Sequence, residues 1–177
     1  GLARVGLLGL TVVLAAFDAA RAARTEALAR GLQARNETLR AAALYDALTG
    51  LPNRMLLDER LILAVRRSER SGKPFALMFV DLDRFKAIND TYGHVVGDRL
   101  LKAVSDRMQG CVRGEDTVAR VGGDEFIVVL AELARGVDAG VVGEKMLKEL
   151  ARPFEVEAHR LDIGASVGLV EVGKDSG

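Results

Sequence analysis

Short apolar runs and helix-periodic blocks alternate along the chain from Asp46 onward. The blocks are long and amphipathic, whereas the runs are too short for helices and predict buried strands. Helices are predicted over residues 53–71, 93–112 and 137–150, and strands over residues 75–81, 116–121, 125–131, 154–159 and 162–172. This order predicts an α+β fold in which helices flank a central, mostly antiparallel sheet of five strands.

Residues 5–17, "VGLLGLTVVLAAF", form an uncharged apolar stretch. A stretch of this length is shorter than the roughly 20 residues that span a bilayer as a helix. Because the sequence begins with Gly1 rather than Met, residues 1–17 fit the end of a transmembrane helix, with Arg21 and Arg24 on its cytoplasmic flank. A signal-peptide core and a packed amphipathic helix remain alternatives. The first interpretation predicts a cytoplasmic domain tethered to the inner membrane.

Residues 18–45 are rich in Ala, Arg and Glu and contain no Pro, which predicts a long N-terminal helix. Leu28, Leu32 and Leu39 keep a partial heptad spacing, although Arg35 interrupts it. This helix therefore fits a coiled coil with a second copy, and it fits a solvated spacer equally well.

Composition limits the classes of partner. The chain of 177 residues has 25 basic and 25 acidic side chains, so its summed charge does not attract nucleic acid. An anionic ligand must therefore be bound by local groups or by metal ions. Cys111 is the only cysteine, so no internal disulfide forms, as expected in a reducing compartment. We expect a small buried thiol near a helix end.

Two carboxylates follow a Gly-Gly pair in the stretch "RVGGDEFIVVL" (120–130). Gly122 and Gly123 predict a tight two-residue turn between strands, because both central positions of such a turn require a positive φ. Asp124 and Glu125 would then occupy fixed places on this turn. Taken alone, acidic residues after a Gly-Gly turn are more often ordinary solvated residues.

Asp81 ends the apolar run "FALMFVD", and ligands in open sheets tend to lie beyond strand ends. If this strand lies beside the hairpin, Asp81 and Asp124 face each other. Two carboxylates so close repel unless a cation lies between them. Oxygen ligands suit Mg²⁺, which also binds phosphate oxygens. The pattern therefore indicates a divalent-cation site at this end of the sheet.

Three longer motifs give this arrangement a specific interpretation. "DALTGLPNR" lies at residues 46–54, "DLDRFKAINDTYGHVVGD" at 81–98 and "RVGGDEF" at 120–126. In this order the chain resembles the GGDEF family of diguanylate cyclases, and the likeness continues to about residue 172. The resemblance implies a nucleotidyl-cyclase or polymerase-palm-like domain over residues 46–177.

Family members join two GTP molecules into cyclic di-GMP and release pyrophosphate, at a site that forms between two domains. The resemblance implies that Asp81, the backbone carbonyl of Leu82 and Asp124 hold Mg²⁺, or Mn²⁺ in its place. It also implies that Lys86 contacts the phosphates and that Glu125 lies near the attacking 3′-hydroxyl, as general base or as support for the metal. Asp124, Glu125 and Lys86 are therefore the expected catalytic residues.

Two further pairs of residues match positions that bind nucleotides in the family. Asn89 and Asp98 resemble the residues that select guanine, whose N1–H and N2–H₂ donors a carboxylate accepts side by side. An Asp98 buried against adenine would be unpaired, at a cost of roughly 1–3 kcal/mol. Arg113 and Asp116 resemble the inhibitory site that binds cyclic di-GMP, with a surface ion pair as the alternative.

Family domains continue past Val172 with a final helix whose basic residues contact the phosphates, whereas this chain ends at Gly177. We therefore expect a domain that is incomplete at its C-terminus and weakly active or inactive by itself. Three classes of function compete: a cyclase that works as a homodimer, a catalytically silent sensor of cyclic di-GMP, and a related cyclase that uses another nucleotide. The intact "GGDEF" signature favours the first.

Overall fold

The computed structural model describes residues 21–33, 35–37, 39–40, 43–133 and 139–173. It divides into two units, Gly1–Ala43 and Leu44–Gly177. In the first unit the described residues 21–33 are helical. Leu28 and Leu32 on this helix are 61% and 69% exposed, so their side chains are available for contacts with another molecule.

The prediction of a transmembrane end falls on residues 5–17, which lie outside the described residues. Within the described part of the chain, no helix combines the length and the apolar character needed to cross a bilayer. The coiled-coil prediction for residues 18–45 stays a prediction.

Within the described residues, the second unit contains all six strands and the four helices α2 to α5. Its elements are α2 (Arg54–Ser71), β1 (Phe75–Asp83), α3 (Phe85–Tyr92), α4 (His94–Gln109), β2 (Thr117–Gly122), β3 (Glu125–Leu130), α5 (Ala139–Leu150), β4 (Phe154–Val156), β5 (His159–Leu161) and β6 (Gly164–Val172). The predicted α+β class is confirmed.

The central sheet has the strand order β2-β3-β1-β6, with every neighbouring pair antiparallel. Within the described residues it therefore has four strands, and the prediction of five was wrong. Residues 154–159 do not form one strand of this sheet, because the chain reverses at Glu157, which has a φ of 55°. The short β4 before this reversal pairs only with β5, as a separate hairpin.

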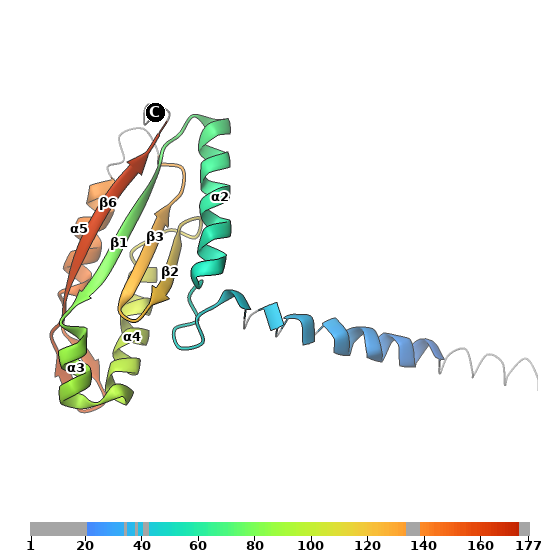
Figure 1. Cartoon of the computed structure of the whole chain (residues 1–177), viewed down its shortest axis with the longest axis horizontal. Helices are drawn as coiled ribbons and strands as arrows, with labels where there is room; N and C mark the ends of the chain where they lie inside the picture. The colour runs from blue at the N-terminus through green and yellow to red at the C-terminus, as the bar shows by residue number, and fades with distance from the viewer. Residues whose placement is uncertain (1–20, 34, 38, 41–42, 134–138, 174–177) are drawn as a thin grey trace, which may run out of the picture. The chain divides into compact units, whose positions relative to one another are not determined.

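The two faces of the sheet pack against different helices. Figure 1 shows α2 beside the β2–β3 half, and α4 and α5 on the opposite side. Met78, Val80 and Leu82 of β1 are buried in the larger core with α4 and α5. Because successive strand residues face opposite sides, Phe79 and Asp81 lie on the α2 side, where both are exposed. An acidic side chain thus emerges at the end of a largely buried strand.

The hairpin between β2 and β3 differs by one residue from the predicted Gly-Gly turn. Gly122 is the last residue of β2 and pairs with Glu125, so the turn residues are Gly123 and Asp124. Only Gly123 of the glycine pair has a positive φ, of 44°. The reason is an irregularity between Arg120 and Gly122, which adds one residue to β2 relative to β3.

The helical block predicted over residues 93–112 is α4, and a separate helix, α3, precedes it. Gly93, with a φ of 86°, lies between them in a backbone conformation that glycine adopts without strain. This break places Lys86 and Asn89 on α3 and Asp98 on α4.

Candidate active site

The candidate site begins at the paired ends of β1 and β3. In the antiparallel register Asp81 is directly opposite Glu125 on one side and Ser166 of β6 on the other. Directly opposite residues share a face, and their Cβ atoms are about 4.5–5.5 Å apart in such pairs. The sequence analysis paired Asp81 with Asp124, whereas the cross-strand partner of Asp81 is Glu125.

Asp124 is joined to the same strand end through its backbone. The Leu82 N–H donates to the Asp124 carbonyl oxygen over 3.3 Å, so the turn lies against the end of β1. Asp124 is half-buried, while Asp81 and Glu125 are exposed. Asp81, Leu82, Asp124 and Glu125 are therefore gathered at one end of the sheet by two adjacent backbone segments.

This group fits a divalent cation by the chemistry of its donors. Carboxylates that lie directly opposite each other repel, and a cation between them would offset that repulsion. All the donors are oxygens, as Mg²⁺ and Mn²⁺ prefer. Among the described residues no cluster of three or more His, Cys, Asp or Glu side chains could hold a metal, so phosphate or backbone oxygens would have to complete the coordination.

Asp83 points to a different partner. Its Oδ1 accepts a hydrogen bond from the Ser166 hydroxyl over 2.9 Å. A Cβ at Gly164 would lie 2.6 Å from Asp83 Oδ2, so the carboxylate lies close to the β6 backbone at this glycine. Asp83 is thus held on β6, which explains why it is a poorer candidate ligand than Asp81.

Hydrogen bonds from the Arg120 side chain hold the turn at Gly123 and Asp124 in place. Its Nε and Nη2 atoms donate to the Gly123 carbonyl oxygen over 3.0 and 2.7 Å. Its Nη1 atom donates to Asp46 Oδ1 over 2.9 Å, and the two side chains are 12% and 25% exposed. Arg120 therefore links the turn to the "DALTG" loop, a role that the sequence analysis missed.

Asp46 is in turn held by its own loop. Its Oδ1 also accepts hydrogen bonds from the Thr49 N–H and hydroxyl, over 2.9 and 2.7 Å. Burial alone raises the pKa of Asp46, but the hydrogen bonds from Thr49 and Arg120, together with the charge of Arg120, hold this pKa below its ordinary value. The Asp46 carboxylate is therefore held in place by Thr49 and Arg120, and its negative charge lies next to the guanidinium that binds the turn.

Asp81 borders two hollows in the surface. A groove of about 720 Å³ runs along the α2 side of the sheet, and its lining includes Leu57, Phe79, Asp81, Glu125 and Ser166. A more polar cleft of about 820 Å³ lies beside α3, and its lining includes Asp81, Asp83, Arg84 and Tyr92. The acidic strand end therefore borders space of nucleotide size on both sides.

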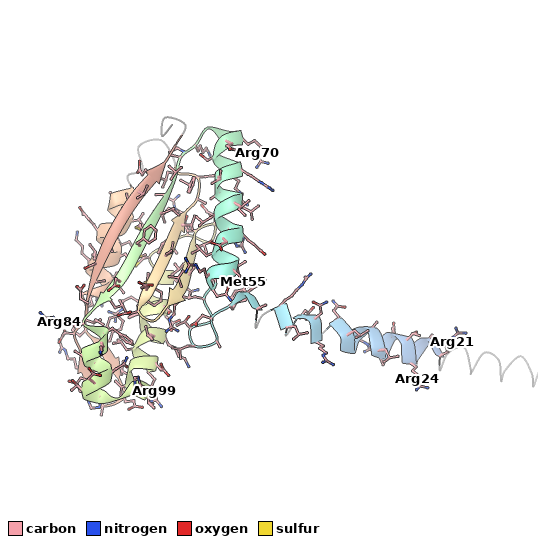
Figure 2. All side chains as sticks on the ribbon, in the orientation of Figure 1. Arg21, Arg24, Met55, Arg70, Arg84 and Arg99 are labelled. Carbon is pink, nitrogen blue, oxygen red and sulfur yellow. The ribbon has the colours of Figure 1, made fainter. Side chains whose placement is uncertain are left out.

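Arg84 marks the connection between β1 and α3 (Figure 2). It has a φ of 60°, an unusual value for a residue with a side chain. Such conformations persist when the surrounding structure imposes them, often beside a functional site. The tight connection brings the first turn of α3, with the exposed Lys86, directly after the acidic strand end.

The two predicted guanine-selecting residues come from neighbouring helices. Asn89 on α3 is half-buried, and its amide lies against Gly97 of α4. Asp98 follows Gly97 directly. Its side chain is exposed, whereas the predicted selective role assumed a side chain buried against the base. Asn89 therefore lies against Gly97, the residue that precedes Asp98. Neither Asn89 nor Asp98 lines the two hollows that Asp81 borders.

Arg113 and Asp116 lie in a separate pocket of about 520 Å³, whose lining also includes Arg60 and Arg67 of α2. Asp116 accepts hydrogen bonds from the backbone N–H groups of Arg113 and Ala131, over 2.9 and 3.0 Å. Its contact with Arg113 is therefore through the backbone and not through the guanidinium. Sequence reasoning missed Arg60 and Arg67, because they are distant along the chain.

Comparison with known proteins assigns the family. Residues 43–177 match the family model described as diguanylate cyclase, GGDEF domain. The chain therefore belongs to the GGDEF family, as its motifs predicted.

The relatives differ in their named activities. MucR of Pseudomonas aeruginosa, a bifunctional diguanylate cyclase/cyclic di-GMP phosphodiesterase, is 43% identical over 165 residues, which cover 93% of this chain and 24% of MucR. NbdA of the same organism, a cyclic di-GMP phosphodiesterase, is 40% identical over 146 residues, which cover 82% of this chain and 18% of NbdA. The chain thus spans about a quarter or less of the length of these relatives.

Among solved structures, the coiled coil and GGDEF domain of DgcB from Caulobacter crescentus, in complex with c-di-GMP, superimposes with a TM-score of 0.76. The two chains are 30% identical, and the match covers 86% of this chain and 82% of DgcB. The described fold is therefore that of a GGDEF domain.

Proposed function

We propose that the protein is a Mg²⁺-dependent diguanylate cyclase whose productive site forms between two copies of the domain over residues 46–177. The observation that carries this proposal is the register that sets Asp81 opposite Glu125, next to Asp124, in a chain of the GGDEF family. Phosphoryl transfer mainly requires positioning and neutralisation of charge, and this strand end offers oxygen ligands for both.

In the proposed reaction the 3′-hydroxyl of one GTP attacks the α-phosphorus of the GTP on the facing copy. The α–β phosphoanhydride bond breaks, pyrophosphate leaves, and the hydroxyl proton passes to a base. A second such step closes the ring. Asp81, the Leu82 carbonyl and Asp124 would hold Mg²⁺ or Mn²⁺, which would supply charge neutralisation at the phosphates. Glu125 accepts the proton or supports the metal site, and Lys86 adds positive charge from α3.

The direct test incubates the purified full chain with GTP and Mg²⁺ and separates the nucleotides by chromatography. We expect one cyclic di-GMP for each two pyrophosphates, and loss of activity with EDTA that added Mg²⁺ restores. Asp81→Asn and Asp124→Asn should each lower the rate by roughly two orders of magnitude, as loss of a charge-stabilising group typically does. Asp106→Asn, an exposed change on α4, is the matched control. Because the 177-residue chain is expected to be weakly active by itself, the deciding result is that of the full-length protein: GTP binding without product formation there would refute the proposal.

Guanine selection is assigned to Asp98 together with Asn89. Asp98→Ala should reduce the preference for GTP over ATP by about tenfold or more, because two donors of guanine lose a charged acceptor. The measurement is the ratio of initial rates with each nucleotide, alongside the unfolding midpoint. A variant that still rejects ATP as well as the parent does would remove the assignment and favour a cyclase with another basis of selection.

We further propose that cyclic di-GMP inhibits the enzyme in the pocket of Arg113 and Asp116, with Arg67 as an additional contact. Supporting this, the pocket gathers guanidinium groups that suit phosphate and the Hoogsteen edge of guanine. Arg113→Ala should relieve inhibition by added product and leave the initial rate similar. Unchanged inhibition would show that the product acts elsewhere.

A second candidate function is a sensor that binds cyclic di-GMP without making it. It is favoured by the separation of the Arg113 pocket from the acidic strand end, and by the similarity to NbdA, which is named for phosphodiesterase activity alone. Titration of the full chain with cyclic di-GMP distinguishes the two. Tight binding with no turnover of GTP would support the sensor, whereas product formation would support the cyclase.

The cyclase proposal also implies a location, because GTP is a cytoplasmic substrate. We place the domain in the cytoplasm, at the inner membrane if residues 5–17 end a transmembrane helix. Fractionation of cells that express the full chain, with and without residues 1–20, tests this. Equal recovery of both forms in the soluble fraction would exclude the membrane tether.

A further inference from the structure

Gly97 is a buried residue inside α4, near its first turn. Its backbone is helical, and its N–H donates to the Gly93 carbonyl oxygen over 3.2 Å, so no positive φ explains the absence of a side chain. Glycine in a helix interior is less favourable than alanine, because it gives up more backbone freedom on folding. A glycine at this position therefore requires a reason in its surroundings.

The surroundings supply that reason on one side. A Cβ at Gly97 would overlap Asn89 Oδ1 and would lie 3.0 Å from Asn89 Cγ. The ring of Phe85 would be 3.3 Å away, a tight contact that a small shift relieves. The amide of Asn89 thus occupies the space that any side chain at residue 97 would fill.

The position of this contact matters because Asp98 is the next residue of α4. We propose that Gly97 is a positioning residue for guanine recognition: its lack of a side chain leaves the space in which the Asn89 amide packs against α4, beside Asp98. This inference rests on the proposed function, in which Asn89 and Asp98 bind the same base. A half-buried amide held between two helices keeps one orientation before the nucleotide arrives, so less freedom is lost on binding.

The test introduces Gly97→Ala into the full chain and measures equilibrium binding of GTP and ATP by calorimetry. We expect the added methyl group to displace the Asn89 amide and to weaken GTP binding about tenfold, the effect of one lost hydrogen bond, with little change for ATP. In turnover, the KM for GTP should rise more than kcat falls. Unchanged GTP affinity and selectivity in a folded Gly97→Ala variant would overturn the inference.

Gly143→Ala is the matched control. Gly143 is also a buried helical glycine, on α5, but a Cβ there would make only an ordinary contact, 3.5 Å from the Met78 sulfur. This variant should keep the parental GTP affinity and should be as stable as the parent or more so. The pair of variants separates the loss of a glycine in a helix from the displacement of Asn89.

A double variant, Asn89→Ala with Gly97→Ala, keeps the inference testable if Gly97→Ala alone unfolds. Without the amide, alanine fits at residue 97, so the double variant should be more stable than Gly97→Ala and should bind GTP no worse than Asn89→Ala. Equal instability of the double and single variants would show that Phe85 or the helix itself requires the glycine, and it would overturn the inference. Additive losses of GTP affinity would do the same.

Failure of the proposed function gives a different result. If the parent does not bind GTP, the cyclase proposal fails at once. Thermal unfolding of the parent, the two single variants and the double variant requires no nucleotide. It therefore still shows whether the Asn89 amide occupies the space beside Gly97. If the parent binds GTP and Gly97→Ala binds it equally well, the proposed function stands and only the role of Gly97 is refuted.

Discussion

At the scale of single residues, the candidate site depends on register more than on residue type. The sequence identified Asp81, Asp124 and Glu125 as acidic residues near one strand end, but it could not give their pairing. A shift of one residue moves a strand side chain to the other face. Here the extra residue of β2 sets the turn at Gly123 and Asp124, and the antiparallel register of β1 with β3 places Glu125 opposite Asp81. Motifs alone do not reveal such a local irregularity.

Arg120 and Asp46 show the same limit. Both belong to motifs that the sequence analysis quoted, yet they are 74 positions apart, and their contact becomes visible only in the fold. Arg120 joins the Gly123 carbonyl oxygen to the Asp46 carboxylate. The motif at residues 46–54 therefore supports the turn within the motif at residues 120–126. The family resemblance located both motifs but did not indicate this contact between them.

Asp46→Asn should lower the free energy of unfolding by about 1–3 kcal/mol at pH 7, since hydrogen bonds to a charged group are weakened. The folded-state pKa of Asp46 lies below its ordinary value of 3.8, so the ionised carboxylate contributes its full stabilisation at pH values above that ordinary value. This stabilisation is lost as the pH falls through the folded-state pKa. Urea unfolding at pH 7, 4 and 3 should therefore show a difference between parent and variant that narrows in acid.

The control for this series is Asp106→Asn, which changes an exposed carboxylate on α4. We expect it to leave the free energy of unfolding within about 0.5 kcal/mol of the parent at neutral pH. A difference between Asp46→Asn and the parent that stays constant from pH 7 to pH 3 would contradict the assigned role of the Asp46 charge.

At the scale of elements, the long amphipathic helices and the apolar strands β1 and β3 were predictable, because their burial follows regular periods. The eight-residue helix α3 was missed, since only Phe85 of it is buried. The stretch 154–159 was read as one strand, because its alternation of Phe154, Glu155 and Val156 is correct for β4. The chain reverses at Glu157 without a glycine, the residue that usually indicates such a turn. The sequence therefore contains no sign that residues 154–159 belong to two separate strands.

Arg107 of α4 binds the segment between α5 and β4. Its Nη1 atom donates to the Glu149 and Arg152 carbonyl oxygens over 2.9 and 2.5 Å, and its Nη2 atom donates to the Pro153 carbonyl oxygen over 3.1 Å. Its guanidinium carbon lies 3.5 Å from the ring centroid of Phe154. Cations at a helix C-terminus are favourable, and this one binds three carbonyl groups at and just beyond the C-terminal end of α5.

Arg107→Ala should therefore lower the free energy of unfolding by about 2–4 kcal/mol, from charged hydrogen bonds and the contact with the ring. Arg107→Lys should recover only part of this, because an ammonium cannot form the same fork of bonds. Arg99→Ala is the control on the same helix: Arg99 pairs with Glu157, but the two side chains are 57% and 36% exposed, so the cost should be under about 1 kcal/mol. Equal effects of Arg107→Ala and Arg99→Ala in denaturant unfolding would contradict the assigned role.

At the scale of the whole molecule, the proposed chemistry requires two copies. The acidic strand end and the residues assigned to guanine provide binding groups for one nucleotide per domain, whereas cyclic di-GMP contains two. Leu28, Leu32 and Leu39 are 61%, 69% and 62% exposed in the single chain, so they are apolar surface that a second copy could bury.

The proposed pairing predicts that the rate per molecule depends on protein concentration, because two copies would have to meet to bring two GTP molecules together. Leu28→Gln with Leu32→Gln should raise the concentration of half-maximal specific activity by about a hundredfold or more, since each buried leucine contributes about 1.5–3 kcal/mol to association. High concentration should restore the parental rate, because the catalytic residues are unchanged. Val141→Gln, which alters an exposed residue of α5 that is 64% exposed, should not shift the curve. A specific activity that stays constant from micromolar to nanomolar protein would show that pairing through these leucines does not control catalysis.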